Sequence, residues 1–219
     1  NEIDKKTMQK LESAYMSNKS VSSNSEERSD IIQRAIDMVY VTWTPTQALR
    51  QWHRENVSPK YFPANTLQFG IPYTQGTQCN ESTFLNKLNN ASDFYDVQVF
   101  TGFDDGLKRY GPKYGNDCSR FVSFAWNISR LTTYGFISRI NDGTYRRLPD
   151  YYSLERGDAV VTEPHMFLIA INFPEPPSGS EYDEPYVVCY EQTPPQAALT
   201  FHTYSQLSSD GYIPFSKFK

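Results

Sequence analysis

Four short segments in the last third of the chain have the composition of β-strands, and they limit the choice of fold more than any other feature. Each segment is rich in β-branched, aromatic or other apolar residues and is bounded by turn-forming residues. The four predicted strands are Asp158–Thr162, His165–Ile171, Tyr186–Glu191 and Leu199–Tyr204. A stretch with Pro, Gly and Ser, residues 174–185, connects the second strand to the third. Because helical patterns precede these strands, the sequence predicts an α+β fold with a mainly antiparallel sheet.

The part of the chain before the strands predicts helices separated by irregular segments. Ser29 or Asp30 is suited to cap a helix that runs to about Val41. Residues 43–79 are rich in aromatic side chains and contain four prolines, which argues against long regular elements. Residues 141–152 predict a loop. Two shorter predicted helices are Glu81–Leu88 and Asp104–Arg109.

The length of 219 residues fits one domain with a tail. Residues 1–29 are polar and are predicted to form an N-terminal tail or linker, with a short helix over Lys5–Met16. Residues 30–219 are predicted to form the single folded domain. The chain starts at Asn1, which fits either a removed export signal or a trimmed chain.

Asp117-Cys118-Ser119 places a thiol at the start of a predicted helix that runs to about Arg130. The apolar residues that follow at helical spacing are Phe121, Val122, Phe124 and Ala125. A helix N-terminus presents free N–H groups and a partial positive charge, and both stabilise a thiolate. The pattern therefore indicates that Cys118 is a candidate nucleophile, and that this helix packs on one face of the sheet.

The composition excludes several classes of partner. The net charge is −4 and no basic block is present, which argues against binding to nucleic acid through its phosphates. No run approaches the roughly 18 apolar residues of a membrane helix, so we expect no integral membrane segment. The three histidines are isolated and no zinc-type spacing occurs, so the sequence predicts no metal site and no cofactor. It predicts no oligomeric state.

The chain has three cysteines, which is too few for a disulfide scaffold. The odd number leaves at least one thiol free unless the chain pairs with another molecule. Cys79 and Cys189 are a possible disulfide pair, and the sequence leaves that question open.

A thiolate nucleophile needs an imidazole that shuttles the proton and a polar group that orients the imidazole. His165 opens an apolar predicted strand 47 residues after Cys118, and it is the strongest partner. Glu191, at the end of the next strand, is the favoured orienting group. Side chains alternate along a strand, so only one of Glu191 and Gln192 can point at His165. Gln192 and His202 remain the alternatives.

These residues resemble the cell-wall cysteine peptidases of the NlpC type and the related CHAP amidase and peptidase domains. The motifs occur in the same order as in those families, over about residues 30–215. Three departures occur. Arg120 stands where the families usually have a small residue, and about 40 residues separate Tyr73 from Cys118, which would be an insertion. The third catalytic position is not the histidine that is common in the NlpC type. The motifs that carry the resemblance are Gly70-Ile71-Pro72-Tyr73, Asp117-Cys118-Ser119-x-Phe121-Val122, Leu154-x-x-Gly157-Asp158, His165-Met166-x-x-Ile169 and Glu191-Gln192-Thr193.

The resemblance implies a papain-like cysteine hydrolase, with N-terminal helices packed on the sheet, that cleaves amide bonds in peptidoglycan stem peptides. In that family role Cys118 attacks the carbonyl and forms an acyl-enzyme, His165 transfers the proton, and Glu191 orients His165. The substrate would be peptidoglycan or a muropeptide, and the protein would be exported to the cell envelope or the extracellular space. The residues that the resemblance places in the substrate site are Tyr73, Asp117, Ser119 and Arg120.

Two other functions remain open at this point. The departures at Arg120 and before Cys118 favour a cysteine amidase or acyltransferase that acts on a substrate outside the wall. The other alternative is a binding domain with an inactive site, in which Cys118 is an ordinary buried cysteine. Tyr73 is as compatible with aromatic packing as with a substrate contact, and Arg120 with a solvated helix position.

Overall fold

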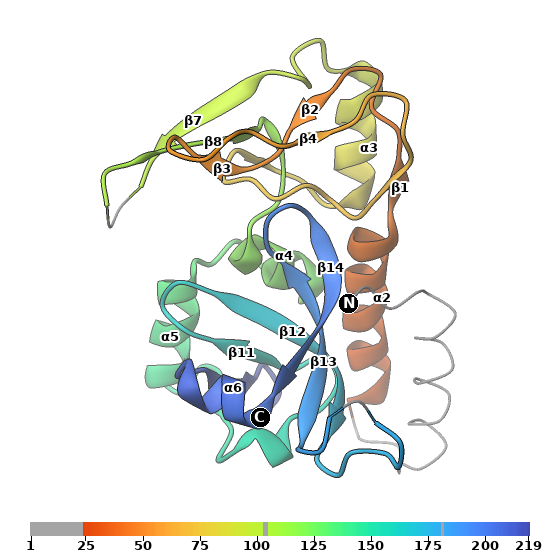
Figure 1. Ribbon diagram of the computed structural model, residues 1–219. Coiled ribbons are helices and arrows are strands. Elements are labelled where there is room, and N and C mark those ends of the chain that lie inside the picture. Colours follow the sequence, from red (N-terminus) through yellow and green to blue (C-terminus); the bar gives the residue numbers. More distant parts are fainter. Residues whose placement is uncertain (1–23, 103–104, 181) are drawn as a thin grey trace.

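The computed structural model describes residues 24–102, 105–180 and 182–219, and these residues form two lobes (Figure 1). The first, called here the sheet lobe, comprises residues 24–41 and 116–219 and contains the largest sheet. The second, called the upper lobe, comprises residues 42–115 and contains short strands and one helix. The predicted helix over Lys5–Met16 lies outside the described residues. The structure combines helices with mainly antiparallel sheets, which confirms this part of the predicted α+β fold.

The sheet lobe is built on a six-stranded sheet in which every neighbouring pair is antiparallel. All four predicted strands belong to this sheet, and their ends differ from the prediction by at most two residues. The two strands at the other side, β10 and β15, were not predicted. In spatial order the strands are β10 (Arg146–Arg147), β15 (Ile213–Ser216), β11 (Ala159–Val161), β12 (Met166–Phe173), β13 (Tyr186–Gln192) and β14 (Ala197–Thr203).

The central strands β12 and β13 are apolar on both faces because both faces of the sheet are covered. Leu168 belongs to the core under the long helix α2 (Ser25–Tyr40) and the helix α4 (Cys118–Ala125). Phe167, which points the other way, packs with Leu207 of the helix α6 (Tyr204–Ser209). Burial on both sides explains why these strands appear in the sequence as continuous apolar runs.

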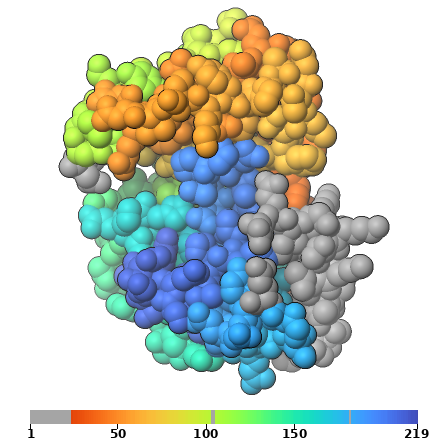
Figure 2. Space-filling view, viewed as in Figure 1, coloured from red at the N-terminus to blue at the C-terminus, as the bar shows by residue number. Residues whose placement is uncertain are grey.

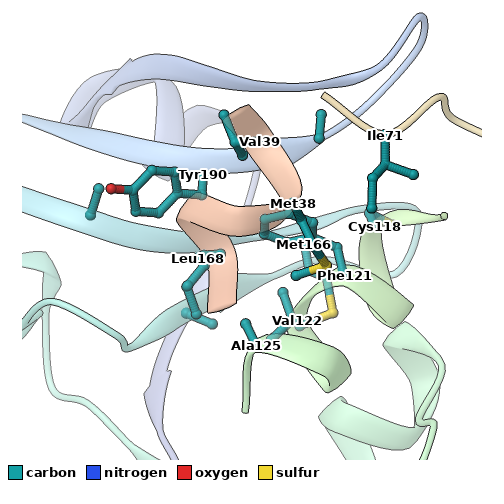
Figure 3. Close-up of a cluster of buried hydrophobic side chains, with 14 of the residues drawn as sticks. Met38, Val39, Ile71, Cys118, Phe121, Val122, Ala125, Met166, Leu168 and Tyr190 are labelled. Atoms are coloured by element: carbon teal, nitrogen blue, oxygen red, sulfur yellow. The ribbon is translucent and has the colours of Figure 1, made fainter. Parts of the chain in front are cut away.

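The core between the helices and the sheet is continuous from α2 to α4 (Figure 3). Met38 and Val39 of α2 meet Phe121 and Val122 of α4, and the sheet contributes Met166 from β12. All of these side chains are buried. The helix that begins with Cys118 thus packs on one face of the sheet, as the sequence predicted.

Helix α2 begins at Ser25, so the prediction that Ser29 or Asp30 caps it is wrong by one turn. Its first turn is polar. Arg28 in that turn is buried and forms an ion pair with Asp158, whose carboxylate oxygen lies 2.9 Å from the guanidinium. Arg28 also donates to the carbonyl of Arg156 at 2.7 Å. A polar first turn held by distant partners leaves no apolar pattern from which its start can be predicted.

The helix boundaries after Cys118 also differ from the prediction. Helix α4 ends at Ala125 rather than near Arg130 because Asn127 adopts a left-handed backbone conformation with φ of 51°, which no helix continues through. A further helix, α5 (Thr133–Asn141), was not predicted. Thr132 caps it by accepting a hydrogen bond from the Gly135 N–H. The predicted loop at 141–152 contains β10 and one short 3-10 turn.

The upper lobe has few long elements, as the prolines and aromatic residues of 43–79 predicted. Its helix α3 (Glu81–Asn90) confirms the prediction at 81–88, and the Asn80 side chain caps it. The predicted helix at 104–109 is wrong for the residues described, because 108–112 form the strand β8, which pairs with β7. The strands are β1 (Thr42–Trp43), β2 (Leu49–Arg50), β3 (His53–Arg54), β4 (Tyr61–Phe62), β5 (Gln68–Phe69), β6 (Thr77–Gln78), β7 (Val97–Thr101), β8 (Lys108–Pro112) and β9 (Tyr114–Gly115).

The lobes meet where the turn between β13 and β14 rises against the upper lobe (Figure 2). The Tyr73 N–H donates to the carbonyl of Pro195 at 2.9 Å, and the Ala197 N–H donates to that of Ile71 at 2.8 Å. Gly70 at this junction has a φ of 76°, and a Cβ there would lie 2.2 Å from the Ala197 carbonyl oxygen. The close approach of the two backbones therefore requires glycine.

None of the helices in the described part of the chain combines the length and the apolar character needed to cross a lipid bilayer.

Candidate active site

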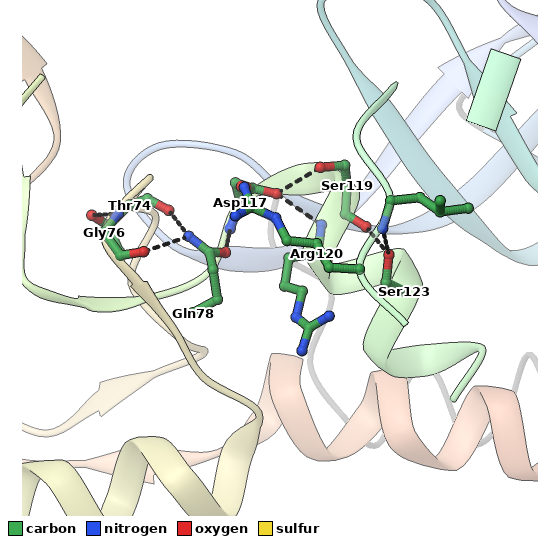
Figure 4. A network of polar contacts seen from close by, with 9 residues as sticks. Thr74, Gly76, Gln78, Asp117, Ser119, Arg120 and Ser123 are labelled. Atoms are coloured by element: carbon green, nitrogen blue, oxygen red, sulfur yellow. Dashed lines mark hydrogen bonds and ion pairs between the residues drawn. The ribbon is translucent and has the colours of Figure 1, made fainter. Parts of the chain in front are cut away.

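Cys118 is the first residue of α4, and its helix start is held by Asp117. One Asp117 carboxylate oxygen accepts from the Arg120 N–H at 2.7 Å and from the Ser119 hydroxyl at 2.8 Å (Figure 4). The Asp117 N–H in turn donates to the side-chain oxygen of Gln78 in the upper lobe at 2.9 Å. The cap fixes the backbone on which the thiol stands, and helix geometry leaves the Cys118 N–H without a partner inside the helix.

His165 lies directly before β12 and connects the thiol to a buried carboxylate. Its Nε2 atom is 2.7 Å from Oε1 of Glu191, and the Cys118 thiol lies near enough to the ring to raise the pKa of His165. Glu191 is only 6% exposed, near the end of β13. An ionised carboxylate can only accept, so Nε2 of His165 carries a proton and Nδ1 is left for the thiol.

The charges of this group support one another. Burial lowers the pKa of His165, but the hydrogen bonds with Cys118 and Glu191 outweigh burial and raise it to about 9. Burial likewise raises the pKa of Glu191, but hydrogen bonds from His165, His202 and Thr200 outweigh it and bring this pKa well below its usual range. The arrangement therefore favours an imidazolium beside an ionised Glu191 near neutral pH.

The structure separates the candidates for the orienting group. Glu191 faces His165, whereas the Gln192 side chain points to the opposite face and donates to the carbonyl of Ile71 at 3.0 Å. Within the described part of the chain, His202 makes no hydrogen bond with His165. Its Nε2 atom lies 3.0 Å from the second carboxylate oxygen of Glu191 instead. Strand alternation had predicted that only one of Glu191 and Gln192 could face His165.

The thiol opens into a cleft of about 890 Å³ between the two lobes. The upper lobe contributes Tyr73, Gln75 and Phe100 to its wall, and the sheet lobe contributes Cys118 and Ser119 together with residues from α5 and from the turn before β12. The side chains of this cleft that carry charge besides Asp117 are Arg130 and Glu163. A cleft of this size, walled on one side by aromatic rings and on the other by the thiol, is suited to bind a substrate beside the sulfur.

Arg130 and Glu163 were not predicted as site residues. Arg130 is half exposed and lies 3.1 Å from the second carboxylate oxygen of Asp117. The hydroxyl of Tyr134 donates to the Glu163 carboxylate, and the Thr133 hydroxyl donates to the Glu163 carbonyl at 2.6 Å. Arg130 follows α4 and Glu163 precedes His165, so proximity to the two catalytic candidates along the chain was the signal that could have identified them.

The predicted substrate residues divide into those at the cleft and one that lies elsewhere. Tyr73, Asp117 and Ser119 line the cleft, although the Ser119 hydroxyl is engaged by Asp117. Burial, and secondarily the nearby Cys118, raises the pKa of the Tyr73 hydroxyl, so this group stays protonated beside the thiol. Arg120 is not among the described residues that line the cleft, because its guanidinium lies 3.9 Å from the centre of the Phe124 ring and points away from Asp117 (Figure 4).

The other two thiols differ from Cys118 in their surroundings. Cys79 and Cys189 are both free and buried, so they do not form the disulfide that the sequence left open. Burial raises the pKa of Cys79 to about 11 and raises that of Cys189 well above its usual value. Within the residues that the structure describes, neither of these two thiols is hydrogen-bonded to an imidazole. Cys118 is therefore the thiol suited to nucleophilic chemistry.

Comparison with known proteins adds no relative to this description. No family model, no curated protein and no solved structure matches the chain. The site is therefore defined by its own geometry, which is a thiol at a helix start, an imidazole between that thiol and a buried carboxylate, and a cleft that gives access to the sulfur.

Proposed function

We propose that the chain is a papain-like cysteine hydrolase that cleaves amide bonds in peptidoglycan stem peptides. The observation that supports this most strongly is the group formed by the Cys118 thiol in the cleft, the His165 ring whose pKa the thiol raises, and the Glu191 carboxylate bonded to that ring. Nucleophile, base and orienting group are the three parts that a cysteine hydrolase needs.

The reaction follows from the positions of these groups. The Cys118 thiolate attacks the substrate carbonyl carbon, and the carbonyl π electrons move to oxygen. When that intermediate collapses, the C–N bond breaks and the His165 imidazolium gives its proton to the leaving amine, which leaves a thioester on Cys118. His165 then takes a proton from water and the hydroxide attacks the thioester carbonyl. Collapse of this second intermediate breaks the C–S bond, releases the carboxylic acid and restores the Cys118 thiolate beside the His165 imidazolium.

The tetrahedral oxygen needs hydrogen-bond donors. The N–H of Cys118 lies at the start of α4, where no carbonyl of the same helix reaches it and where the helix dipole favours negative charge. Asp117 fixes this backbone through the bonds to Arg120 and Ser119. The helix start thus supplies one donor of an oxyanion site without a further side chain.

The wall substrate is proposed from two sources. The motifs around Cys118, His165 and Glu191 resemble those of the NlpC and CHAP types in residue identity and order. In addition, the cleft offers Arg130 and Glu163, and stem peptides carry both carboxylates and amino groups that such side chains bind. A protein that acts on this polymer works in the cell envelope or outside the cell, which is the location we propose.

The test is digestion of purified peptidoglycan by the wild-type protein and by Cys118→Ala, followed by the release of free amino groups. We expect the wild-type protein to release them and Cys118→Ala to lose at least about a thousandfold in rate, as loss of a nucleophile does in related mechanisms. Cys189→Ala, which removes a buried thiol outside the cleft, is the matched control and should retain the activity.

Equal digestion by the wild-type protein and Cys118→Ala would contradict the proposal. If the wild-type protein leaves the wall intact but uses Cys118 to cleave or transfer small acyl donors, the alternative of a cysteine amidase or acyltransferase with another substrate replaces it. Mass spectrometry of the products from wall fragments and from small acyl donors separates these results.

A further inference from the structure

The carboxylate of Glu191 is held from two sides. Its Oε1 atom lies 2.7 Å from Nε2 of His165, as described above. Its Oε2 atom accepts from the Thr200 hydroxyl at 2.5 Å and contacts Nε2 of His202 at 3.0 Å. The mechanism proposed above uses only the first oxygen, so the partners of the second oxygen are left without a role.

Both of these partners come from β14, the edge strand beside β13. Thr200 and His202 are two positions apart on the strand, so their side chains are on the same face, the face toward which Glu191 points. The His202 ring is stacked on Phe167 with ring centres 4.4 Å apart and an angle of 13° between the planes. Phe167 lies two residues after His165 and its ring also contacts that of His165, with ring centres 5.9 Å apart, so one aromatic ring touches both imidazoles.

The hydrogen-bond roles are fixed by chemistry. A carboxylate that is ionised only accepts, so the Nε2 atom of His202 must carry a proton to bond to it. Glu191 then has three donors, His165, His202 and Thr200, and its side chain is only 8% exposed. A buried carboxylate with one donor fewer would be more easily protonated and freer to rotate away from His165.

We propose that His202 is a positioning residue of this active site, which holds the second oxygen of Glu191 so that the first oxygen stays ionised and aimed at His165. The inference rests on the proposed role of Cys118, His165 and Glu191. It extends the group to a fourth side chain, which acts on the thiol only through Glu191 and His165.

Other groups that face Glu191 must be considered in any pH experiment. Cys189 lies on the same strand, two residues away, and Glu191 contributes to the raised pKa of its thiol after burial. Tyr212, which precedes β15, has a pKa raised by burial and next by Glu191. Both pKa values lie above the usual ones, so neither group titrates near neutral pH, where His165 and Glu191 are compared.

The experiment measures the rate of alkylation of Cys118 by iodoacetamide as a function of pH, with the modified peptide identified by mass spectrometry. His202→Phe keeps an aromatic ring against Phe167 but removes the N–H, and His202→Gln offers an amide N–H in its place. Glu191→Gln removes the charge on which His202 is inferred to act, and Thr200→Val removes the other donor to the same oxygen.

We expect His202→Phe to alkylate about tenfold more slowly near neutral pH, since a hydrogen bond to a charged group is lost. The wild-type profile should have its upper inflection near the pKa of His165 at about 9. In His202→Phe this inflection should move to lower pH, because a less firmly ionised Glu191 supports the imidazolium less. His202→Gln should recover a large part of the rate, and His202→Phe should add little when Glu191→Gln is already present.

A merely structural role for His202 would lower the unfolding midpoint and leave the pH profile unchanged, and that result would overturn the inference. Equal profiles of His202→Phe and His202→Gln would also overturn it. If His202→Phe does not fold, His202→Leu, which also removes the N–H donor, takes its place in the comparison with His202→Gln, and the inflection again either moves with loss of the donor or stays.

Failure of this inference is distinguishable from failure of the proposed function. Alkylation requires no substrate, so a positive result for His202 stands even if the protein does not digest peptidoglycan. Conversely, digestion that depends on Cys118 stands even if the alkylation profile of His202→Phe is that of the wild-type protein.

Discussion

The sheet lobe and the upper lobe both line the cleft, but they hold their contributions in different ways. In the sheet lobe, strands of seven and eight residues and the capped helix α4 fix Cys118, His165 and Glu191. In the upper lobe, most strands are two residues long, and the wall residues Tyr73 and Phe100 are held by ring contacts with Trp52 at 5.3 and 5.4 Å.

The difference teaches where each part of the function resides. The groups proposed to react lie on a framework with many backbone hydrogen bonds between distant segments, which suits chemistry that depends on small distances. The wall that would contact the substrate depends on packed rings and short turns, which tolerate changes of side chain more easily. Changes in the sheet lobe should therefore affect folding and reaction rate, and changes in the upper lobe should affect substrate binding.

The largest effect is expected from Asp158→Ala in the sheet lobe. The Asp158 carboxylate is fully buried and lies 2.9 Å from Arg28, so its removal leaves a buried guanidinium short of its partner. We expect a loss of about 3–5 kcal/mol in the free energy of unfolding, measured by urea denaturation. The matched control in the upper lobe is Asp93→Ala, which removes a partly exposed ion pair with Lys113 and a hydrogen bond from the Tyr114 hydroxyl and should change stability less than Asp158→Ala.

A second variant separates the pair from its packing. Replacing both partners, Arg28→Met with Asp158→Leu, should recover part of the loss because no unpaired charge is then buried. Equal losses for Asp158→Ala and Asp93→Ala would show that the two lobes do not differ in the way described above.

The next effect is a pH dependence of stability that belongs to the sheet lobe. His165 has a pKa raised from about 6.5 to about 9 in the folded protein. A group with a raised folded pKa stabilises fully below its unfolded value, and this contribution is lost as the pH rises through the folded value. We therefore expect the free energy of unfolding to fall between about pH 6.5 and pH 9, as measured by urea denaturation at each pH.

His165→Gln should remove this slope and leave the rest of the curve in place. Lys113→Gln in the upper lobe is the control that should keep the slope, because the hydrogen bond with Asp93 raises the pKa of Lys113 and it titrates above this window. A slope that persists in His165→Gln would assign it to another group.

The smallest effect is expected from Tyr73→Phe in the upper lobe. The ring keeps its contact with Trp52 while the hydroxyl beside Gln75 and Cys118 is lost. We expect stability to fall by about 1 kcal/mol or less, and KM for wall fragments to rise about threefold with kcat nearly unchanged. Tyr152→Phe, at an exposed position, is the control. A loss confined to kcat would place Tyr73 with the reacting groups and would weaken the contrast between the lobes.

The central strands of the sheet could be predicted because they are buried, and buried strands consist mainly of apolar residues that are visible in the sequence. Segments such as 166–173 are apolar except for Asn172 and are bounded by Pro, so their existence and order follow from composition. Strand β10 could not be predicted, since it consists of two exposed arginines that are strand residues only because they pair with Phe215 and Ser216. Long-range pairing of this kind leaves no local pattern.

The nucleophile and the base of the candidate site were predictable because only a few residue types can perform each of these roles. Cys118 at a helix start and His165 at a strand start follow from local pattern, and alternation reduced the third residue to Glu191 or Gln192. Arg120 and Arg130 show the limit, because both follow the same thiol. Which one lies at the cleft depends on where α4 ends, and Asn127 ends it through a backbone conformation that the helical pattern did not reveal.

The Gln78 side chain has a consequence for how the protein works as a whole. Its amide nitrogen donates to the carbonyls of Thr74 and Gly76, each at 3.1 Å, and its oxygen accepts from the N–H of Asp117. One amide group therefore ties the turn beside Tyr73 to the residue that caps the nucleophile helix. The helix start that carries the Cys118 thiol is therefore braced by a side chain of the other lobe, so the position of the thiol and that of the cleft wall depend on the same amide group.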